Sequence, residues 1–410
     1  MNTHKLPDFE YQCFNCGLLG ELDEDFICPG CQEPRALMHR GEVDKAIFST
    51  PPENLWHYSA LLPIADATRV QHLGEGATPL VKAPRLAKTH GIGRILLKNE
   101  MANPSGSFKD RQVSVGIHHA QEMGAKTVTA VSSGNVASAT SAFAARLGMK
   151  AIVFMHGQAS PAKIAQAAVY GARVIRVNSP APSEAFHLCL KACERWGWYH
   201  CSTAGMYNPF NVEGAKTIAY ELYYQTGGEL PDWIVAPVGG GGLLGGIWRG
   251  LLDLKRLGLI ETLPRIAGIQ PTGCAPLIRA IDGNESFLES IMDPWPDPKS
   301  IAGGLADDIL FDGQTALPAI RRTNGVAIAV DDEAIFNAVG HLATQEGLMP
   351  EFCSAVTIAA LDQIPDCDEN TTVCCILTGN GIKDVGAIAK QVEEPPLIDA
   401  DIEALAELIG

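Results

Sequence analysis

The sequence has little positive charge and no long apolar run. Its 410 residues carry 31 lysines and arginines against 47 aspartates and glutamates, a formal net charge of −16. Nucleic-acid binding favours a concentrated basic surface, so this balance disfavours a nucleic-acid partner. No run of about 20 apolar residues is present, so we expect no membrane partner. Residues 1–16 lack the apolar core of a secretory signal, and we therefore expect a cytoplasmic protein.

Cysteine is too scarce for a disulfide scaffold of this length, and it is unevenly distributed. Four of the twelve cysteines lie between residues 13 and 31, and the others are scattered. Because cytoplasmic thiols stay reduced, we expect the scattered cysteines to be small buried apolar side chains rather than redox groups. They are Cys189, Cys193, Cys201, Cys274, Cys353, Cys367, Cys374 and Cys375.

The composition is that of a globular protein with a large core. Apolar residues make up 46% of the chain and charged residues 19%. This excludes a fibre or a disordered tail, and the length suggests two or three domains.

The clustered cysteines form two CxxC pairs. Cys13 and Cys16 are separated from Cys28 and Cys31 by eleven residues. Four soft sulfur ligands suit a tetrahedral zinc ion, and a segment of about 40 residues buries too little core to fold without such support. The spacing therefore predicts a structural zinc site in a zinc-ribbon-like segment over residues 1–45. Four unrelated thiols or a redox pair remain alternatives.

From residue 92 the chain alternates short β-rich runs with helical runs. This alternation predicts an α/β fold with parallel sheets covered by helices on both faces. The predicted strands are 94–99, 126–131, 150–155, 172–177, 232–238, 264–271, 325–330 and 371–378. The predicted helices are 110–123, 136–147, 161–170, 183–196 and 243–257. Two such units predict two lobes with a cleft beyond the carboxyl ends of the strands.

Four consecutive glycines follow one predicted strand and precede a helix. Gly239 to Gly242 let backbone N–H groups converge on an anion, and the helix N-terminus adds a positive partial charge. The run lacks the spacing of a dinucleotide fingerprint and the lysine of a P-loop. It predicts a phosphate-binding loop, although a flexible turn is an alternative.

A lysine lies at the start of another predicted helix. Lys109 follows Phe108 and a Gly/Ser turn. A positive helix end disfavours a charged amine, and a neutral lysine is a nucleophile that can condense with an aldehyde. The combination with a phosphate-binding loop suggests pyridoxal phosphate (PLP).

At these residues the sequence resembles the threonine synthase family, which has the two-lobed fold-type II architecture of PLP enzymes such as tryptophan synthase β. The resemblance runs from about residue 74 to about residue 390 and rests on six ordered motifs. The motifs are GEGATPL (74–80), NPSGSFKDR (103–111), SSGNVAS (132–138), NPFNVEGAKT (208–217), PVGGGGLLGG (237–246) and TGNGIKD (378–384).

The resemblance implies roles at the matching positions. Lys109 would bind the cofactor aldehyde beside Phe108, and Thr378 would face the pyridine nitrogen. A neutral hydroxyl there makes the ring a weaker electron sink and favours elimination and replacement. The residues implied to hold the cofactor phosphate are Gly239, Gly240, Gly241, Gly242 and Leu243. The residues implied to bind the amino-acid substrate are Ser132, Ser133, Gly134, Asn135 and Asn211, and Asn135 would also lie near the cofactor.

One position departs from the family. Threonine synthases typically carry an arginine that helps hold the substrate phosphate where this chain has Asn211. An amide cannot replace the charged, bidentate grip of a guanidinium, so the leaving group and the nucleophile stay open. Lys163, Lys216 or Arg111 could compensate, although each also suits a structural or solvated position.

The implied activity is a PLP-dependent lyase that converts O-phospho-L-homoserine and water to L-threonine and phosphate. One alternative is β-elimination or β-replacement on another amino acid, as in threonine or serine ammonia-lyases or a cysteate synthase using phosphoserine. A non-catalytic PLP- or metabolite-binding regulator is a more distant alternative, which the intact Lys109 disfavours.

The resemblance also implies a domain layout and an assembly. We expect a large PLP-binding domain from residues 46–112 and 200–395, and a small mobile domain from residues 113–199. A helix is expected within residues 396–410, with an apolar face that packs on a partner or on its own lobe. The family resemblance implies a homodimer.

Overall fold

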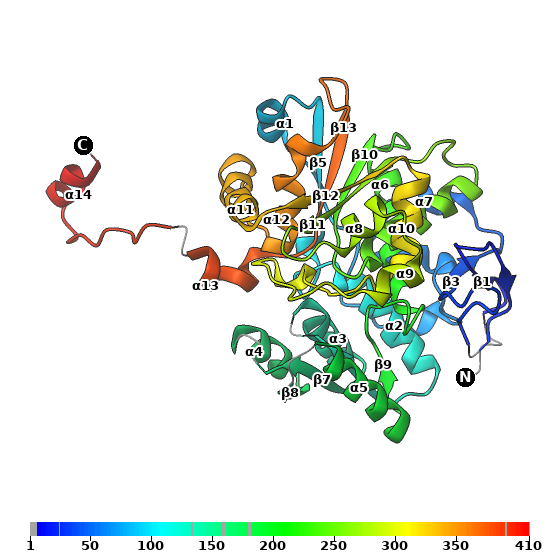
Figure 1. Cartoon of the computed structure of the whole chain (residues 1–410). Coiled ribbons are helices and arrows are strands. Elements are labelled where there is room, and N and C mark those ends of the chain that lie inside the picture. The colour runs from blue at the N-terminus through cyan, green and yellow to red at the C-terminus, as the bar shows by residue number, and fades with distance from the viewer. Residues whose placement is uncertain are drawn as a thin grey trace.

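The computed structural model describes residues 6–23, 25–132, 134–157, 161–178, 182–389 and 392–409. Over these residues the strands form a six-stranded, a four-stranded and a three-stranded sheet. The two larger sheets belong to separate layers of helices and strands, and the three-stranded sheet lies at the side of the larger layer (Figure 1).

The six-stranded sheet has the order β12-β11-β10-β13-β5-β4. All neighbours run parallel except β4, which is antiparallel to β5 at one edge. The strands are β4 (Leu80–Lys82), β5 (Arg94–Asn99), β10 (Trp233–Pro237), β11 (Arg265–Pro271), β12 (Val326–Val330) and β13 (Thr372–Leu377). A segment near residue 95 therefore pairs with one near residue 375, which closes the large lobe.

The four-stranded sheet is entirely parallel, with the order β8-β7-β6-β9. Its strands are β6 (Thr127–Val131), β7 (Lys150–His156), β8 (Arg173–Val177) and β9 (Tyr199–His200). The helices nearest in sequence are α2 (Lys109–Glu122), α3 (Asn135–Arg146), α4 (Pro161–Val169) and α5 (Pro182–Trp196).

The larger lobe carries most of the remaining helices. They are α1 (Pro84–His90), α6 (Thr217–Gln225), α7 (Gly242–Arg256), α8 (Pro276–Asp282), α9 (Phe287–Met292), α10 (Gly313–Arg322), α11 (Asp332–Glu346), α12 (Phe352–Ala359) and α13 (Val385–Ile388). All strands and helices predicted after residue 92 are confirmed within a few residues. The prediction missed the edge strands β4 and β9, which are only three and two residues long.

The six-stranded sheet is buried on both faces. Alternate residues of β13 belong to different cores: Cys374 packs into the core that contains α7, and Cys375 packs into the core that contains α12. This is the pattern expected of a parallel sheet between two helical layers. Among the scattered cysteines, Cys193, Cys353 and Cys367 are only partly buried, so the expectation of buried thiols is wrong for these three.

The N-terminal residues form the small antiparallel sheet. Its strands are β2 (Leu19–Gly20), β1 (Phe9–Gln12) and β3 (Ala36–His39). The sheet is attached to the large lobe through Phe14, whose ring lies 4.8 Å from that of Trp248 in α7. The Arg322 guanidinium also donates to the Phe14 carbonyl at 2.7 Å.

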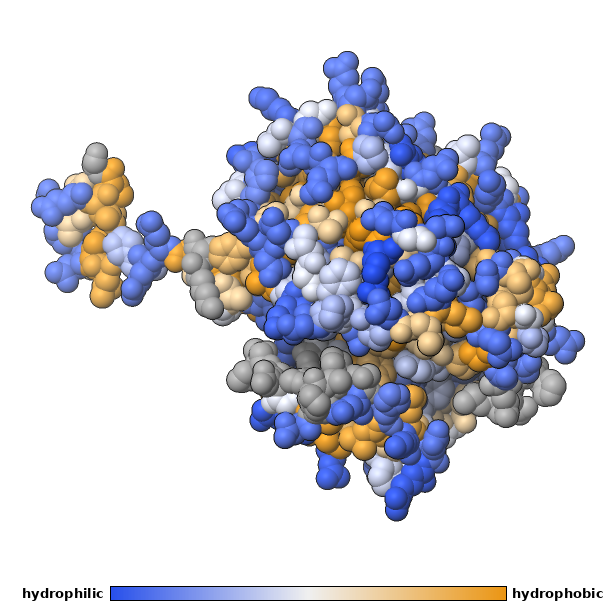
Figure 2. Space-filling model, viewed as in Figure 1, coloured by the Kyte–Doolittle hydropathy of each residue, from blue (hydrophilic) through white to orange (hydrophobic). Residues whose placement is uncertain are grey.

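The C-terminal residues extend away from the body and end in α14 (Ile402–Ile409) (Figure 1). None of the α14 residues is buried. Its apolar side chains are visible on the projecting tail, while hydrophilic residues cover much of the body on the face shown in Figure 2. Among the described helices, none has the length and apolarity needed to cross a bilayer.

Candidate active site

A cavity of about 490 Å³ lies where the carboxyl ends of strands from both larger sheets meet. Small-molecule sites commonly have volumes of this order. The glycine loop after β10 and Thr378 after β13 line it from the large lobe, and Ser132 after β6 lines it from the small lobe. The cavity therefore occupies the cleft that the strand order predicts.

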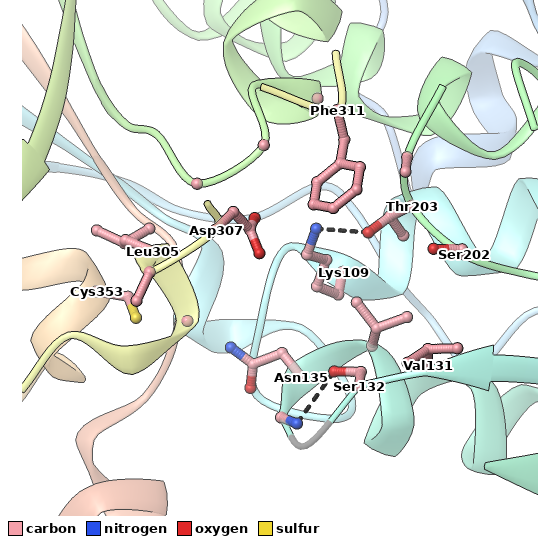
Figure 3. A pocket seen from close by; sticks show the side chains of 18 of the residues that line it. Lys109, Val131, Ser132, Asn135, Ser202, Thr203, Leu305, Asp307, Phe311 and Cys353 are labelled. Carbon is pink, nitrogen blue, oxygen red and sulfur yellow. Dashed lines mark hydrogen bonds between the residues drawn. The ribbon is translucent and has the colours of Figure 1, made fainter. Parts of the chain in front are cut away.

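Lys109 is the first residue of α2, and its amine lies inside the cavity (Figure 3). Its Nζ donates to Thr203 Oγ1 at 2.7 Å and to Gln112 Oε1 at 3.3 Å. Burial lowers the pKa of Lys109 to about 8, although the carboxylates of Asp307 and Asp312 oppose this shift. The amine is thus partly neutral near pH 8, and burial is the largest cause of its lowered pKa.

The glycine loop leads directly into α7 and leaves no room for side chains. Gly241 has φ 102°, a left-handed conformation that glycine alone adopts readily, and a Cβ there would lie 2.9 Å from Ala316 Cβ. A Cβ on Gly239 would lie 2.8 Å from Asp307 Oδ2. Gly239, Gly240, Gly241, Gly242 and Leu243 all line the cavity. A loop of this shape at a helix N-terminus fits a phosphate group.

The loop after β6 lines the opposite side. Ser132, Gly134 and Asn135 reach the cavity, whereas Ser133 lies outside the described residues. Asn135 Nδ2 donates to both oxygens of Glu351, at 3.0 and 3.1 Å, and Lys383 Nζ donates to Asn135 Oδ1 at 2.6 Å. These contacts hold the start of α3 against the large lobe.

Thr378 and Phe108 lie together at the floor of the site. The Phe108 N–H donates to the Thr378 carbonyl at 2.9 Å, and both residues line the cavity. The Thr378 hydroxyl lies 3.0 Å from that of Ser354. The Lys109 Nζ is 4.7 Å from the centre of the Phe108 ring, so the lysine, the ring and the hydroxyl face one space.

Asn211 does not lie with these residues, and its expected contact with substrate needs correction. It is completely buried, donates from Nδ2 to the Ser202 carbonyl at 3.1 Å, and is not among the residues lining the cavity. Its amide packs against Gly116 of α2, where even a Cβ would lie 1.9 Å from Asn211 Oδ1. The residue fixes helix packing instead.

Three cationic side chains could replace the missing arginine, and two of them also lie outside the cavity. Arg111 is fully buried against Glu100 and Glu221, and Lys216 is fully buried against Glu213 and Asp253. Lys163 lines the cavity and lies 3.5 Å from Asp384. Lys109 and Lys163 are the cationic residues among the described residues that line the cavity.

Several lining residues escaped prediction from the sequence. Thr203, Phe311 and Cys353 lie in segments whose sequence carries no recognisable functional motif. Asp307 and Asp312 lie in the segment GGLADDILFDG, residues 303–313. Burial raises the pKa of Asp307 to about 6 and that of Asp312 to about 7. Acidic residues within a glycine-rich stretch are the one signal that could have indicated them.

The four N-terminal cysteines converge at a separate place. The Sγ atoms of Cys13, Cys16, Cys28 and Cys31 all lie within 4.8 Å of one another. This is the one group of three or more potential metal ligands within the described residues. Four sulfur atoms so arranged can hold a single tetrahedral ion.

A partly neutral lysine, a glycine loop at a helix N-terminus and a hydroxyl in one cleft define a two-lobed α/β enzyme of the PLP-dependent class. The family model "Pyridoxal-phosphate dependent enzyme" matches residues 72–379. The chain belongs to the pyridoxal-phosphate dependent enzyme family.

Within this family, the chain is similar to curated threonine synthases. The chain is 33% identical to the threonine synthase of Methanocaldococcus jannaschii, over 97% of this chain and 98% of the relative. It is 34% identical to the threonine synthase of Synechocystis sp., over 93% and 94% of the two chains. These relatives confirm the resemblance to the threonine synthase family.

Solved structures share the fold. The T.th. threonine deaminase is 27% identical with a TM-score of 0.62, covering 78% of this chain and 94% of that one. A fungal L-serine ammonia-lyase from Rhizomucor miehei is 22% identical with a TM-score of 0.66, covering 77% and 98%. The second likeness concerns the fold alone.

Proposed function

We propose that the chain is a threonine synthase, which converts O-phospho-L-homoserine and water to L-threonine and phosphate. The observation that carries this proposal is one cavity containing Lys109 and the glycine loop, in a chain 33% identical to a curated threonine synthase over nearly its whole length. The lysine suits the cofactor aldehyde, and the loop suits the cofactor phosphate.

The proposed residue roles follow from position. Gly239, Gly240, Gly241, Gly242 and Leu243 hold the cofactor phosphate, Thr378 faces the ring nitrogen, and Phe108 packs beside the ring. Ser132, Ser133, Gly134 and Asn135 bind the substrate carboxylate. For all of these except Ser133, support comes from their shared cavity. Asn211 is left out because its buried amide does not reach that space.

The chemistry divides between cofactor and protein. PLP, when bound, supplies an electron sink that stabilises negative charge beside the substrate Cα. Lys109 accepts and returns the Cα proton, and its pKa of about 8 suits both transfers near neutral pH. The Asn135–Glu351 contact links the substrate-binding loop to the large lobe.

A second candidate function is β-elimination or β-replacement on a hydroxy- or phospho-amino acid. The observation that favours it is the absence of any arginine among the described residues that line the cavity. Product analysis distinguishes the two functions. The purified enzyme is incubated with phosphohomoserine, phosphoserine, threonine or serine, with and without sulfite. Threonine formed from phosphohomoserine supports the synthase; oxo acid or cysteate as the only product supports the alternative.

Lys109→Ala provides the matched inactive control. The variant should lose both turnover and the visible absorption of covalently held cofactor, because it removes the amine that lies beside the glycine loop and Thr378. Lys163→Ala should keep the absorption. A catalytically competent Lys109→Ala enzyme would exclude the assignment.

The four-cysteine cluster is proposed to bind structural zinc in a zinc-ribbon-like segment, over residues 1–45. Its support is the convergence of the four Sγ atoms and their position away from the cavity. We also propose the domain boundaries 46–112 with 200–395 for the large domain, and 113–199 for the small one. The separate six-stranded and four-stranded sheets support this division.

A homodimer and a cytoplasmic location are also proposals. The support for a homodimer is the exposed apolar face of α14, where Ile402 and Ile409 are 69% and 74% exposed. An exposed apolar face on a projecting helix is typical of an interaction surface. Light scattering on the purified chain tests the homodimer, and localisation of a tagged chain tests the cytoplasmic location.

A further inference from the structure

Asp307 is a carboxylate of the cavity that the proposed roles leave unused. It lies two residues after the short helix η7 (Gly303–Leu305) and lines the cavity. Figure 3 shows its side chain directed toward the amine of Lys109. Among the charged groups that act on Lys109, Asp307 has the largest effect.

The position of Asp307 is fixed from two sides. Its carboxylate accepts a hydrogen bond from the Gly240 N–H, and its carbonyl oxygen accepts one from Cys274 Sγ at 3.1 Å. The carboxylate is therefore anchored between the glycine loop and the lysine while it stays partly exposed to the cavity. A side chain in this place can reach substrate atoms bound beside Lys109.

The proposed reaction requires a proton donor besides Lys109. Lys109 takes a proton from the substrate and has to return it to carbon, so it is not free to protonate the leaving phosphate. Breaking the C–O bond of a phosphate ester dianion would also release fully deprotonated phosphate, a strong base. A positioned acid avoids this unfavourable release by protonating the phosphate as the bond breaks.

We propose that Asp307 is the catalytic acid that protonates the departing phosphate, an inference that rests on the proposed function. The Cγ–O bond breaks, its electron pair stays on the phosphate oxygen, and that oxygen takes the Asp307 proton. The proton lost from Cβ is balanced by one delivered to Cγ, which becomes the methyl group, and the Cα proton returns to Cα through Lys109. Water then adds its oxygen to Cβ and gives a proton to the Asp307 carboxylate. The residue ends in the form in which it began, and no other reactant is consumed.

The electrostatic surroundings of Asp307 suit this cycle. Burial raises its pKa to about 6, Lys109 and the Gly240 N–H oppose the shift, and Asp308 adds to it. Asp312 faces the same space from the start of α10, and the thiol of Cys274 contacts the Asp307 backbone. Bound anionic phosphates favour the protonated form further.

The pH dependence follows from this protonation state. An acid must carry its proton to act, so kcat for phosphate release should fall as pH rises through the pKa of Asp307 in the complex. Asp307→Asn cannot titrate and should lack this alkaline limb. Glu351 and Cys353 of the α12 segment also line the cavity, and they are unchanged in that variant.

The decisive experiment compares leaving groups in the PLP-loaded enzyme. Chloride needs no proton to leave, so 3-chloroalanine serves as the control substrate for phosphohomoserine. In Asp307→Asn, phosphate release should fall about 100-fold relative to chloride release. Asp307→Glu should recover part of the loss. Asp297→Asn, at an exposed position outside the cavity, should behave as the wild type.

A binding measurement provides a readout that does not depend on turnover. Inorganic phosphate is titrated into the PLP-loaded enzyme by calorimetry in buffers of different ionisation enthalpy. Wild type should take up a proton on binding, because the anion favours protonated Asp307, and Asp307→Asn should take up less. Unchanged PLP absorption shows that the variant has kept its site.

Three results would overturn the proposal. They are an equal fall of both elimination rates in Asp307→Asn, wild-type phosphate release by that variant, and unchanged proton uptake. If wild type releases no phosphate from phosphohomoserine, the proposed synthase function fails separately. The comparison is then made between threonine and 3-chloroalanine, because hydroxide needs a proton to leave even more than phosphate does.

Discussion

Glu221 is a buried carboxylate that is expected to be costly to neutralise. It lies on α6 with no exposed surface and accepts from Lys98 Nζ at 2.6 Å and from Arg111 Nη1 at 2.5 Å. The N–H groups of Ala77 and Thr78 also donate to it. Glu221→Gln keeps the shape but leaves the buried Lys98 without its counter-ion and leaves Arg111 with Glu100 alone.

The magnitude follows from the charge environment. Burial alone would raise the pKa of Glu221, but Arg111 and Lys98 outweigh it and lower the pKa from 4.5 to about 2. A shift of this size corresponds to about 3 kcal/mol of stabilisation at neutral pH. Removing one partner of a buried ion pair typically costs about 3–5 kcal/mol, which agrees with the stabilisation worked out from the pKa shift. Glu221→Gln should therefore lower the free energy of unfolding by about 3 kcal/mol.

Urea unfolding at pH 7 and at lower pH tests this reasoning. A lowered carboxyl pKa stabilises above 4.5, and the stabilisation is lost as pH falls toward about 2. Wild type should lose this contribution over that range, and Glu221→Gln should lack it. Glu229→Gln, at an exposed position, is the matched control and should change stability by less than about 0.5 kcal/mol. An effect below about 1 kcal/mol at pH 7 would refute the account of the buried pair.

Three further outcomes are expected. Cys28→Ser should lose bound zinc in elemental analysis while Cys367→Ser keeps it, and zinc retained by Cys28→Ser contradicts the four-sulfur site. Gly241→Ala adds about 1–2 kcal/mol of strain from the left-handed backbone and places the new Cβ 2.9 Å from Ala316 Cβ, so the Kd for PLP should rise about tenfold. Gly148→Ala, at a left-handed position with open space around it, should leave the Kd for PLP unchanged. Because burial raises the pKa of Asp312 to about 7 and an anion nearby favours the protonated form, PLP affinity should fall as pH rises through that value, and Asp312→Asn should flatten the curve. A pH profile identical to wild type would exclude that role.

Local patterns predicted the elements and the loops that follow them. The predicted strands at 94–99 and 232–238 became β5 and β10, because short apolar runs suit a parallel sheet that is covered on both faces. The glycine loop and Lys109 could be found because their chemistry depends on residue type at a strand end or a helix start. These features can be read from the local sequence, so they locate the cleft without knowledge of contacts between distant segments.

The site residues that the sequence did not predict correctly are those whose positions depend on packing between distant segments. Arg111 lies two residues from Lys109 in sequence, yet it points into a buried pair with Glu221, 110 residues away. Asn211 lies within a family motif, NPFNVEGAKT, but its amide packs against Gly116 of α2 and does not reach the cavity. Asp307 reaches the cavity because η7 folds over the glycine loop, and no local pattern encodes that approach. Residue type alone could not separate structural from reactive charges at these places.

The central claim is that this site breaks a carbon–oxygen bond of phosphohomoserine and adds water at Cβ. Turnover in water enriched in oxygen-18, followed by mass spectrometry of both products, tests it most directly. The account predicts threonine with one heavy oxygen and phosphate with none, released in equal amounts. Heavy oxygen in the phosphate, or phosphate release without threonine, would contradict it.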